Sequence, residues 1–325
     1  MDTAALDPRP GRPPSDSAGP DTVITVRGLR CSYGDYEAVR GIDLDVRRGE
    51  LFALLGTNGA GKTTTMETLE GHRAPSAGTV EVLGLDPSRD RRSPRPRIGM
   101  MLQESGFAGD LTVAETVRLW SRLTTSPTDA DMALTRVALI DRRDTRVSQL
   151  SGGQKRRLDL LLATLGGPEV LFLDEPTTGL DPESRERTWA LIRQLLAGGC
   201  TILMTTHYLE EAQQLADRVA IMHDGGIALS GTVAEVLAAQ PSRVAFGVEG
   251  HAPADVLRSL QTAAGDAHID DDGRLVLETN DLQTTLTRTM SWAQDHGHRL
   301  TGISATEASL ASVFSHVATD HQEDA

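Results

Sequence analysis

Long apolar runs are missing from this sequence of 325 residues. No stretch approaches the roughly 18 apolar residues that a membrane-spanning helix needs. The opening stretch, MDTAALDPRPGRPPSDSAGPD, has no apolar core like that of a secretory signal peptide, and its prolines prevent regular structure. We therefore expect a cytoplasmic chain that begins with a disordered tail at residues 1–20.

Cysteine and basic charge are also scarce. The two cysteines, Cys31 and Cys200, stand far apart in the sequence, so neither a disulfide framework nor a zinc site is encoded. With 32 Lys and Arg residues against 46 Asp and Glu residues, the formal net charge is -14. This charge argues against general nucleic-acid binding, which depends on neutralising phosphates.

Short apolar segments alternate with helical patterns from Val23 onwards. LFALL (51–55), VLFL (170–173) and TILMTT (201–206) have the mainly apolar character of strands that helices cover on both faces. The segment 217–231 predicts a hairpin that turns at Asp-Gly-Gly. We predict an α/β fold with a parallel core sheet, interrupted by a helical insertion at about 106–165.

The strand at 51–55 runs into GTNGAGKTT, which contains the full G-x-x-x-x-G-K-[ST] pattern of a P-loop. In such a loop the backbone N–H groups cradle phosphates, the lysine reaches the β- and γ-phosphate oxygens, and the next hydroxyl holds Mg²⁺. The pattern therefore predicts nucleotide binding. The predicted phosphate-binding residues are Gly56, Thr57, Asn58, Gly59, Ala60, Gly61, Lys62, Thr63 and Thr64.

The strand at 170–173 ends in a pair of acids, Asp174 and Glu175. An aspartate here can orient a Mg²⁺ ion, and the adjacent glutamate, on the opposite side, can accept a proton from an attacking water. By itself such a pair is typical of a solvated strand end. Its occurrence with a P-loop favours a catalytic reading.

The segment LSGGQ at 150–154 predicts a second helix N-terminus that attracts anions. Ser151 and Gln154 have capping-box spacing, and two glycines would let a ligand approach the backbone. An ordinary capped helix is the alternative on spacing alone.

Together the P-loop, the acid pair and LSGGQ resemble the motifs of the ATP-binding cassette (ABC) family. In that family two cassettes pair head to tail, and the signature LSGGQ of one contacts the γ-phosphate held by the other's P-loop. The resemblance covers roughly residues 23–240 and implies a P-loop NTPase cassette with a parallel core sheet, an antiparallel β subdomain and a helical insertion. It also implies ATP and Mg²⁺ as ligands and a homodimer as the working unit.

Further residues match positions of the family. Tyr33 matches the aromatic that stacks on adenine, Gln103 the glutamine that links the metal site to the helical insertion, and His207 the histidine that senses the γ-phosphate. The resemblance implies catalytic roles for Glu175, His207 and Gln103. It implies metal ligation by Thr63, Gln103 and Asp174. It implies contacts to ATP from Tyr33, Ser151, Gly152, Gly153, Gln154 and Asp181 in addition to the P-loop.

The segment TTHYLEEAQQLADRVAIM and the tail EASLASVF are most similar to drug-resistance cassettes of the daunorubicin exporter type, whose permeases belong to the ABC-2 class. This likeness implies an ATPase subunit for drug or antibiotic efflux, held at the inner face of the cell membrane by a permease. The alternative is a stand-alone ABC ATPase with a regulatory or protein-interaction role.

Other P-loop proteins fit less well. A GTPase needs an N-K-x-D guanine reader, but neither Asn58 nor Asn280, the only asparagines, starts one. Chromosome-maintenance ATPases insert a long coiled coil, DNA-repair cassettes carry zinc cysteines, and translation-factor relatives have two cassettes in one chain. None of these features is present in the sequence.

We divide the chain into the tail (1–20), an ATPase domain (21–240) and a small C-terminal α+β appendage (241–325). Alternating apolar residues at 244–248 and 275–277 predict strands, and the patterns at 254–260 and 281–294 predict helices. Ser304 and Glu307 have the spacing of a capping box, which predicts a final helix with one apolar stripe. The stripe comprises Leu310, Val313, Phe314 and Val317. It packs either on the appendage's own strands or on a second chain, and its distance in sequence from the P-loop argues against a direct part in the chemistry.

Overall fold

A six-stranded sheet lies at the centre of the molecule, which we describe from a computed structural model for residues 21–90, 97–102, 106–124 and 127–315. The predicted tail, Gln103 and Val317 lie outside these residues. The strand order is β5-β6-β7-β3-β8-β9, in which neighbouring strands are parallel except for β8 and β9. The strands are β5 (Ile98–Met101), β6 (Val170–Asp174), β7 (Thr201–Thr206), β3 (Leu51–Gly56), β8 (Arg218–His223) and β9 (Gly226–Thr232).

Both faces of this sheet are covered, as the apolar strand segments predict. Because side chains alternate along a strand, Phe52 and Leu54 of β3 join one core, while Leu51, Ala53 and Leu55 join the other. The first core includes α1 (Lys62–Leu69) and a three-stranded antiparallel sheet. The second includes α5 (Pro182–Ala197) and α6 (Leu209–Leu215). The antiparallel strands are β1 (Thr22–Tyr33), β2 (Tyr36–Arg47) and β4 (Ala77–Val82).

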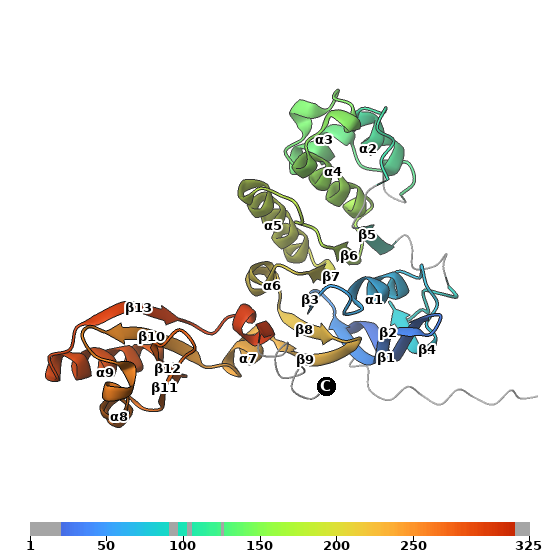
Figure 1. Ribbon diagram of the computed structural model, residues 1–325. Helices are drawn as coiled ribbons and strands as arrows, with labels where there is room; N and C mark the ends of the chain where they lie inside the picture. The colour runs from blue at the N-terminus through green and yellow to red at the C-terminus, as the bar shows by residue number, and fades with distance from the viewer. Residues whose placement is uncertain (1–20, 91–96, 103–105, 125–126, 316–325) are drawn as a thin grey trace, which may run out of the picture.

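The helical insertion extends away from the sheet (Figure 1). It contains α2 (Val113–Ser121), α3 (Ala130–Arg136), two 3₁₀ turns at Ile140–Arg142 and Val147–Gln149, and α4 (Gly152–Thr164), packed around a core of their own. The capping box predicted for α4 is present, and α2 has one as well. Thr112 caps α2 with Glu115, and Ser151 caps α4 with Gln154.

After α7 (Val233–Ala238) the chain forms a separate four-stranded antiparallel sheet (Figure 1). The predicted strands and helices of this appendage are present, and they enclose a core that includes Phe246 and Trp292. The elements are β10 (Ser242–Val248), α8 (Pro253–Ala264), β11 (Ala267–Ile269), β12 (Leu275–Thr279), α9 (Leu282–Asp295) and β13 (Leu300–Thr306).

Two expectations for the final helix were wrong, the capping box at Ser304 and the alternative in which the apolar stripe packs on the appendage's own strands. Ser304 lies in β13, paired with Ala245 of β10, so sheet hydrogen bonding overrides the local capping-box signal. The described helical residues are 310–315, with the Ser309 hydroxyl accepting from the N–H of Ser312 at 3.3 Å. Leu310 and Val313 are buried against the ATPase core instead of the appendage's strands.

Within the described ranges, no helix combines the length and the apolar character that crossing a bilayer requires.

Candidate functional site

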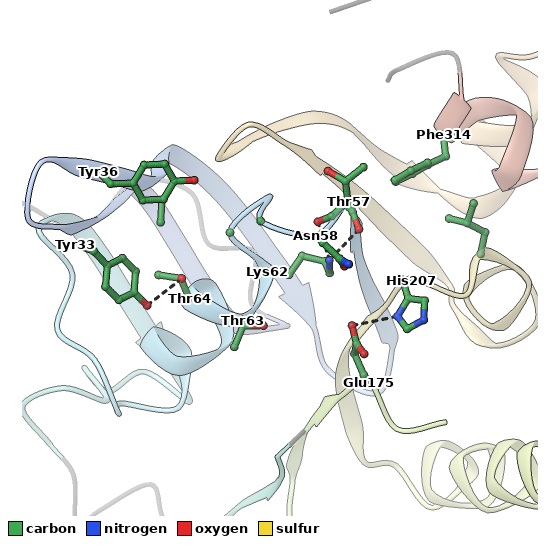
Figure 2. Close-up of a pocket in the computed structure, with 15 residues that line it drawn as sticks. Tyr33, Tyr36, Thr57, Asn58, Lys62, Thr63, Thr64, Glu175, His207 and Phe314 are labelled. Atoms are coloured by element: carbon green, nitrogen blue, oxygen red, sulfur yellow. Dashed lines mark hydrogen bonds and ion pairs between the residues drawn. The ribbon is translucent and has the colours of Figure 1, made fainter. Parts of the chain in front are cut away.

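A cavity of about 870 Å³ opens where β3, β6 and β7 end (Figure 2). These strands are neighbours in the sheet, so their carboxyl ends bring the P-loop, Glu175 and His207 together, as expected for a ligand site in a parallel sheet. The cavity is lined by Tyr33, Tyr36, Ala38, Gly56, Thr57, Asn58, Gly59, Gly61, Lys62, Thr63, Thr64, Glu175, His207, Leu209 and Phe314.

The P-loop needs its glycines for space and for conformation. A Cβ atom at Gly56 would lie 2.6 Å from the carbonyl oxygen of Met222, and one at Gly61 would lie 2.5 Å from that of Ala38. Gly61 also has a φ of 98° and begins α1 without any side-chain cap. The N–H groups of the first turn of α1 are therefore left for an anion at the positive end of the helix.

Lys62 lies across the mouth of this loop. Its ammonium group donates to the carbonyl oxygens of Gly56 (2.8 Å) and Thr57 (3.1 Å). Burial lowers the pKa of Lys62, and the nearby carboxylates of Glu175 and Asp174 oppose this effect. The lysine is thus a cation held beside the phosphate cradle at little distance from two acids.

Glu175 directly faces His207. One carboxylate oxygen, Oε1, lies 3.1 Å from Nδ1 of His207 (Figure 2). The other accepts a hydrogen bond from the hydroxyl of Thr178 at 3.0 Å. The backbone of Glu175 has a φ of 49°, an uncommon value for a residue with a side chain. Such outliers persist where the surroundings impose them, often at functional sites.

Asp174 is buried beside this pair. Its carboxylate accepts a hydrogen bond from the hydroxyl of Thr205. Burial raises the pKa of Asp174, Thr205 counteracts that rise, and Lys62 and Arg156 also favour the charged form. Because the buried carboxylate of Asp174 lies next to that of Glu175, a nearby cation would stabilise their charged forms.

Arg156 is a residue that the sequence analysis missed. It lies on α4, and its buried guanidinium donates to the carbonyl oxygens of Asp174 (2.6 Å), Glu175 (2.6 Å) and Pro176 (3.0 Å). Arginine suits this task because its donors form a rigid planar fork. The helix that begins at the LSGGQ segment is thereby tied to the backbone of the acid pair. Only its place one turn after LSGGQ could have drawn attention to it.

Aromatic side chains line the opposite end of the cavity. Tyr33 is 45% exposed, its hydroxyl lies 3.2 Å from that of Thr64, and the guanidinium of Arg73 stacks 3.9 Å from its ring centroid. Tyr36, which the sequence analysis did not single out, also lines the cavity. Phe314, from the C-terminal helix, also lines the cavity, but on the side of His207, away from the two tyrosines.

The predicted signature residues do not line this cavity. The N-terminus of α4 is exposed at Ser151 and Gly152, and a Cβ atom at Gly152 would meet nothing within 4 Å. A Cβ atom at Gly153 would lie 2.9 Å from the hydroxyl oxygen of Ser184, whose hydroxyl donates to Asp181 at 2.7 Å. The signature and Asp181 therefore lie near each other, apart from the P-loop cavity of their own chain.

Fold and site together define a P-loop nucleotide-binding protein. Comparison with known proteins specifies which kind. The family described as "ABC transporter" matches residues 39–178, and "ABC transporter domain-containing protein-like, C-terminal domain" matches residues 242–309. The chain belongs to the ATP-binding proteins of the ABC transporter family, and it is therefore an ATPase.

Named relatives agree with this assignment. The chain is 44% identical over 223 residues to the daunorubicin resistance ATP-binding protein DrrA3 of Streptomyces coeruleorubidus, covering 67% of this chain and 71% of the relative. It is 36% identical over 300 residues to DrrA2 of the same organism, covering 90% and 93%. It is 39% identical over 219 residues to the Nod factor export ATP-binding protein I of Ralstonia nicotianae, covering 66% and 68%.

Solved structures show the same fold. A structure titled as the ATP-binding subunit of an ABC transporter superposes with a TM-score of 0.61 at 27% identity, covering 66% of this chain and 92% of that one. A nucleotide-free ATP-binding cassette from an ABC transporter superposes with a TM-score of 0.58 at 20% identity, covering 65% and 91%.

Proposed function

We propose that this chain is the ATP-hydrolysing subunit of an ABC-2 type exporter for a drug or antibiotic, driven by ATP-dependent dimerisation of two cassettes. One observation supports the proposed dimer. Of the two glycine-rich helix N-termini described above, that of α1 lines the cavity of its own chain, whereas that of α4 is exposed at Ser151 and Gly152. A second copy supplies the missing half of each site.

In this arrangement each ATP lies between two chains. The P-loop, residues 56–64, holds the phosphates, and Tyr33 stacks on the adenine. The signature of the opposite chain, residues 151–154, closes over the γ-phosphate, and Asp181 contributes from the neighbouring loop. The domain boundaries that we propose remain 21–240 for the ATPase and 241–325 for the appendage.

The residues present fit a Mg²⁺ ion. Thr63 is exposed and lines the cavity, and burial raises the pKa of the Asp174 carboxyl group, so a cation beside it would favour its charged form. Among the described residues no cluster of three His, Cys, Asp or Glu side chains could hold a metal. A site completed by phosphate oxygens and water requires only one or two side chains. Bound Mg²⁺ would neutralise charge on the β- and γ-phosphates, and Gln103 is proposed as a further ligand.

Glu175 is proposed as the general base of hydrolysis. Its carboxylate accepts a proton from water as the water oxygen attacks the γ-phosphorus. The bond between that phosphorus and the bridging oxygen to the β-phosphate breaks, and ADP and inorganic phosphate leave. His207, 3.1 Å from Glu175, orients the carboxylate and contacts the γ-phosphate. Lys62 stabilises the negative charge on the transferring group.

A groove of about 550 Å³ supports a permease partner. It lies between the helical insertion and the edge of the central sheet, where Phe107, Trp120 and Leu123 approach Ile98 and Met100 of β5. Leu123 is 73% exposed and Trp120 is 46% exposed, so two large apolar side chains lie open to solvent at this rim. A short cytoplasmic helix of a membrane permease fits such a groove, since an amphipathic helix buries its apolar face there.

The names of the relatives support the proposed direction of transport and the proposed class of transported compound. DrrA3 and DrrA2 are named for daunorubicin resistance, and the Ralstonia relative for Nod factor export. Export in this chain would place it at the inner face of the cell membrane, bound to the permease.

Complementation between two inactive variants tests the composite site. Lys62→Ala removes the P-loop function, and Gly152→Asp places a carboxylate at the signature where open space leaves the fold unaffected. Each variant alone should be inactive. A one-to-one mixture should recover about a quarter of the wild-type ATP hydrolysis, because half of the dimers are mixed and each has one intact site. A mixture as inactive as its components would show that the signature does not act across chains.

Co-purification tests the permease. Leu123→Asp should release a multi-span membrane protein from the complex, whereas Met132→Asp, an exposed apolar position of the same insertion, should retain it. Equal retention by both variants would contradict docking in this groove. Failure of the wild-type chain to retain any membrane protein would favour the stand-alone ATPase.

A further inference from the structure

The helix at residues 310–315 leaves the appendage and docks on the ATPase core. Leu310 and Val313 are buried in the same core cluster as Ala212 and Leu215 of α6. The backbone N–H of Leu310 also donates to the side-chain oxygen of Gln213 at 3.2 Å. Apolar contact and a hydrogen bond therefore anchor this C-terminal helix to α6.

Helix α6 follows the catalytic end of the sheet after only two residues, His207 and Tyr208. Strand β7 ends at Thr206, His207 comes next, and α6 begins at Leu209. The ring of Tyr208 lies 4.2 Å from that of His207, centroid to centroid. A displacement of α6 therefore moves His207 relative to Glu175.

Phe314 extends the same helix into the cavity itself. It is half-buried, lines the nucleotide cavity together with Leu209 and His207, and packs at the margin of the core. Figure 2 shows Phe314 on the side of His207 and Thr57, away from Tyr33 and Tyr36. The phenyl ring thus borders the phosphate end of the cavity instead of the aromatic end.

We propose that the C-terminal helix is a positioning element of the ATPase site, which holds α6 and His207 in the geometry that hydrolysis requires, with Phe314 as its contact in the cavity. This inference rests on the proposed role of the cavity in ATP hydrolysis. Val236 of α7 lies in the same core cluster as Leu310, so the segments before and after the appendage both pack on this core. Any shift of the appendage therefore acts on the nucleotide site through this helix.

The test compares Phe314→Ala with Ala311→Ser, an exposed position of the same helix, in the full-length chain. Phe314→Ala should lower kcat about ten- to a hundredfold, because small misplacements of reacting groups cost that much, with a change of less than about threefold in the Kd of MgATP. In the MgATP complex, amide hydrogen exchange at residues 207–215 should be faster in the Phe314→Ala variant than in wild type. Phe314→Leu should restore both properties, and Ala311→Ser should change neither.

A double-mutant cycle identifies the route. In a His207→Ala background, Phe314→Ala should lower the remaining turnover by less than about twofold, since the two residues act through one another. Additive losses, or unchanged exchange at residues 207–215, would overturn the proposal. A wild-type chain that fails to bind MgATP would instead refute the proposed function. If the isolated chain hydrolyses ATP slowly, the hydrogen-exchange measurement still reports whether Phe314 stabilises residues 207–215.

Discussion

The N-termini of α1 and α4 share glycines and an electrostatic preference for anions, yet they differ in how they are capped. Helix α1 starts at Gly61 in a left-handed conformation without a side-chain cap, inside a cavity of its own chain. Helix α4 starts at Ser151 with a complete capping box and is exposed to solvent. The capping box satisfies the N–H groups of Ser151 and Gln154, so α4 is stable without a ligand.

In the proposed dimer, this difference separates a phosphate cradle from a docking surface. The N–H groups of the uncapped end are left for a phosphate, and the rest of its cavity comes from the ends of β1, β6 and β7, from β2 and α6, and from the C-terminal helix of the same chain. The capped end keeps its shape without a ligand, as the proposed dimer requires of a surface that meets ATP held by the other chain. Arg156 links the two, because it extends from α4 to the backbone of Asp174 and Glu175.

The largest effect should come at the cavity of α1. Glu175→Gln should lower turnover about 10²- to 10⁴-fold, or about 3 to 5 kcal/mol of barrier, while MgATP affinity is retained. The ATP-bound dimer should accumulate, as measured by size-exclusion chromatography. The exposed Glu186→Gln serves as the control. Near-normal turnover in the Glu175 variant would move the base to another residue, with His207 next in line.

A matched pair of lysines sharpens the comparison between the two helix ends. Lys62→Ala should weaken ATP binding by the isolated chain about 10- to 100-fold, because a charge-assisted contact to phosphate is lost. Lys155→Ala, in the first turns of α4, should leave this binding unchanged because no part of α4 lines the cavity. Isothermal titration calorimetry measures both. A comparable loss in the Lys155 variant would mean that the signature binds nucleotide within its own chain.

The C-terminal ends of the helices also differ, since α1 ends at a buried carboxyl group. Burial raises the pKa of Glu70 to about 8, and the charges of Asp174 and Glu67 add to the rise. The folded protein therefore keeps this proton while the unfolded chain, at its ordinary pKa of 4.5, releases it. The contribution of Glu70 to the free energy of unfolding is therefore fully present below the unfolded pKa of 4.5 and is lost as the pH rises towards 8.

Glu70→Gln removes this pH dependence. The measurement is the free energy of unfolding in urea, for the variant and for wild type, at pH 5 and at pH 8.5. We expect the difference between variant and wild type to shift by about 1 to 3 kcal/mol in favour of the variant from pH 5 to pH 8.5. Glu186→Gln, at an exposed position, should show no such gain. Parallel stability curves for wild type and the Glu70 variant would show that the carboxyl group ionises freely in the folded protein.

The smallest effect should come at the cap of α4. Ser151→Ala should cost about 1 kcal/mol of unfolding free energy, since one cap is lost, without changing ATP binding by the isolated chain. Ser148→Ala, an exposed serine just before α4, is the control. Loss of ATP affinity in the Ser151 variant would contradict the separation of the two helix ends.

Local sequence was sufficient for much of the fold and of the candidate site. The strands at 51–55, 170–173 and 201–206, both capping boxes and the P-loop depend on nearest neighbours and on burial of both sheet faces, so their patterns are legible in the chain. The appendage's strands at 244–248 and 275–277 could be predicted from the sequence for the same reason.

Tertiary structure decided what depends on contacts between distant segments. Pairing with β10 turned Ser304 from a predicted helix cap into a strand residue. Burial of Arg156 behind the acid pair and the return of Phe314 to the nucleotide cavity join residues that no sequence spacing connects, because these contacts form only after the sheet has brought their partners together.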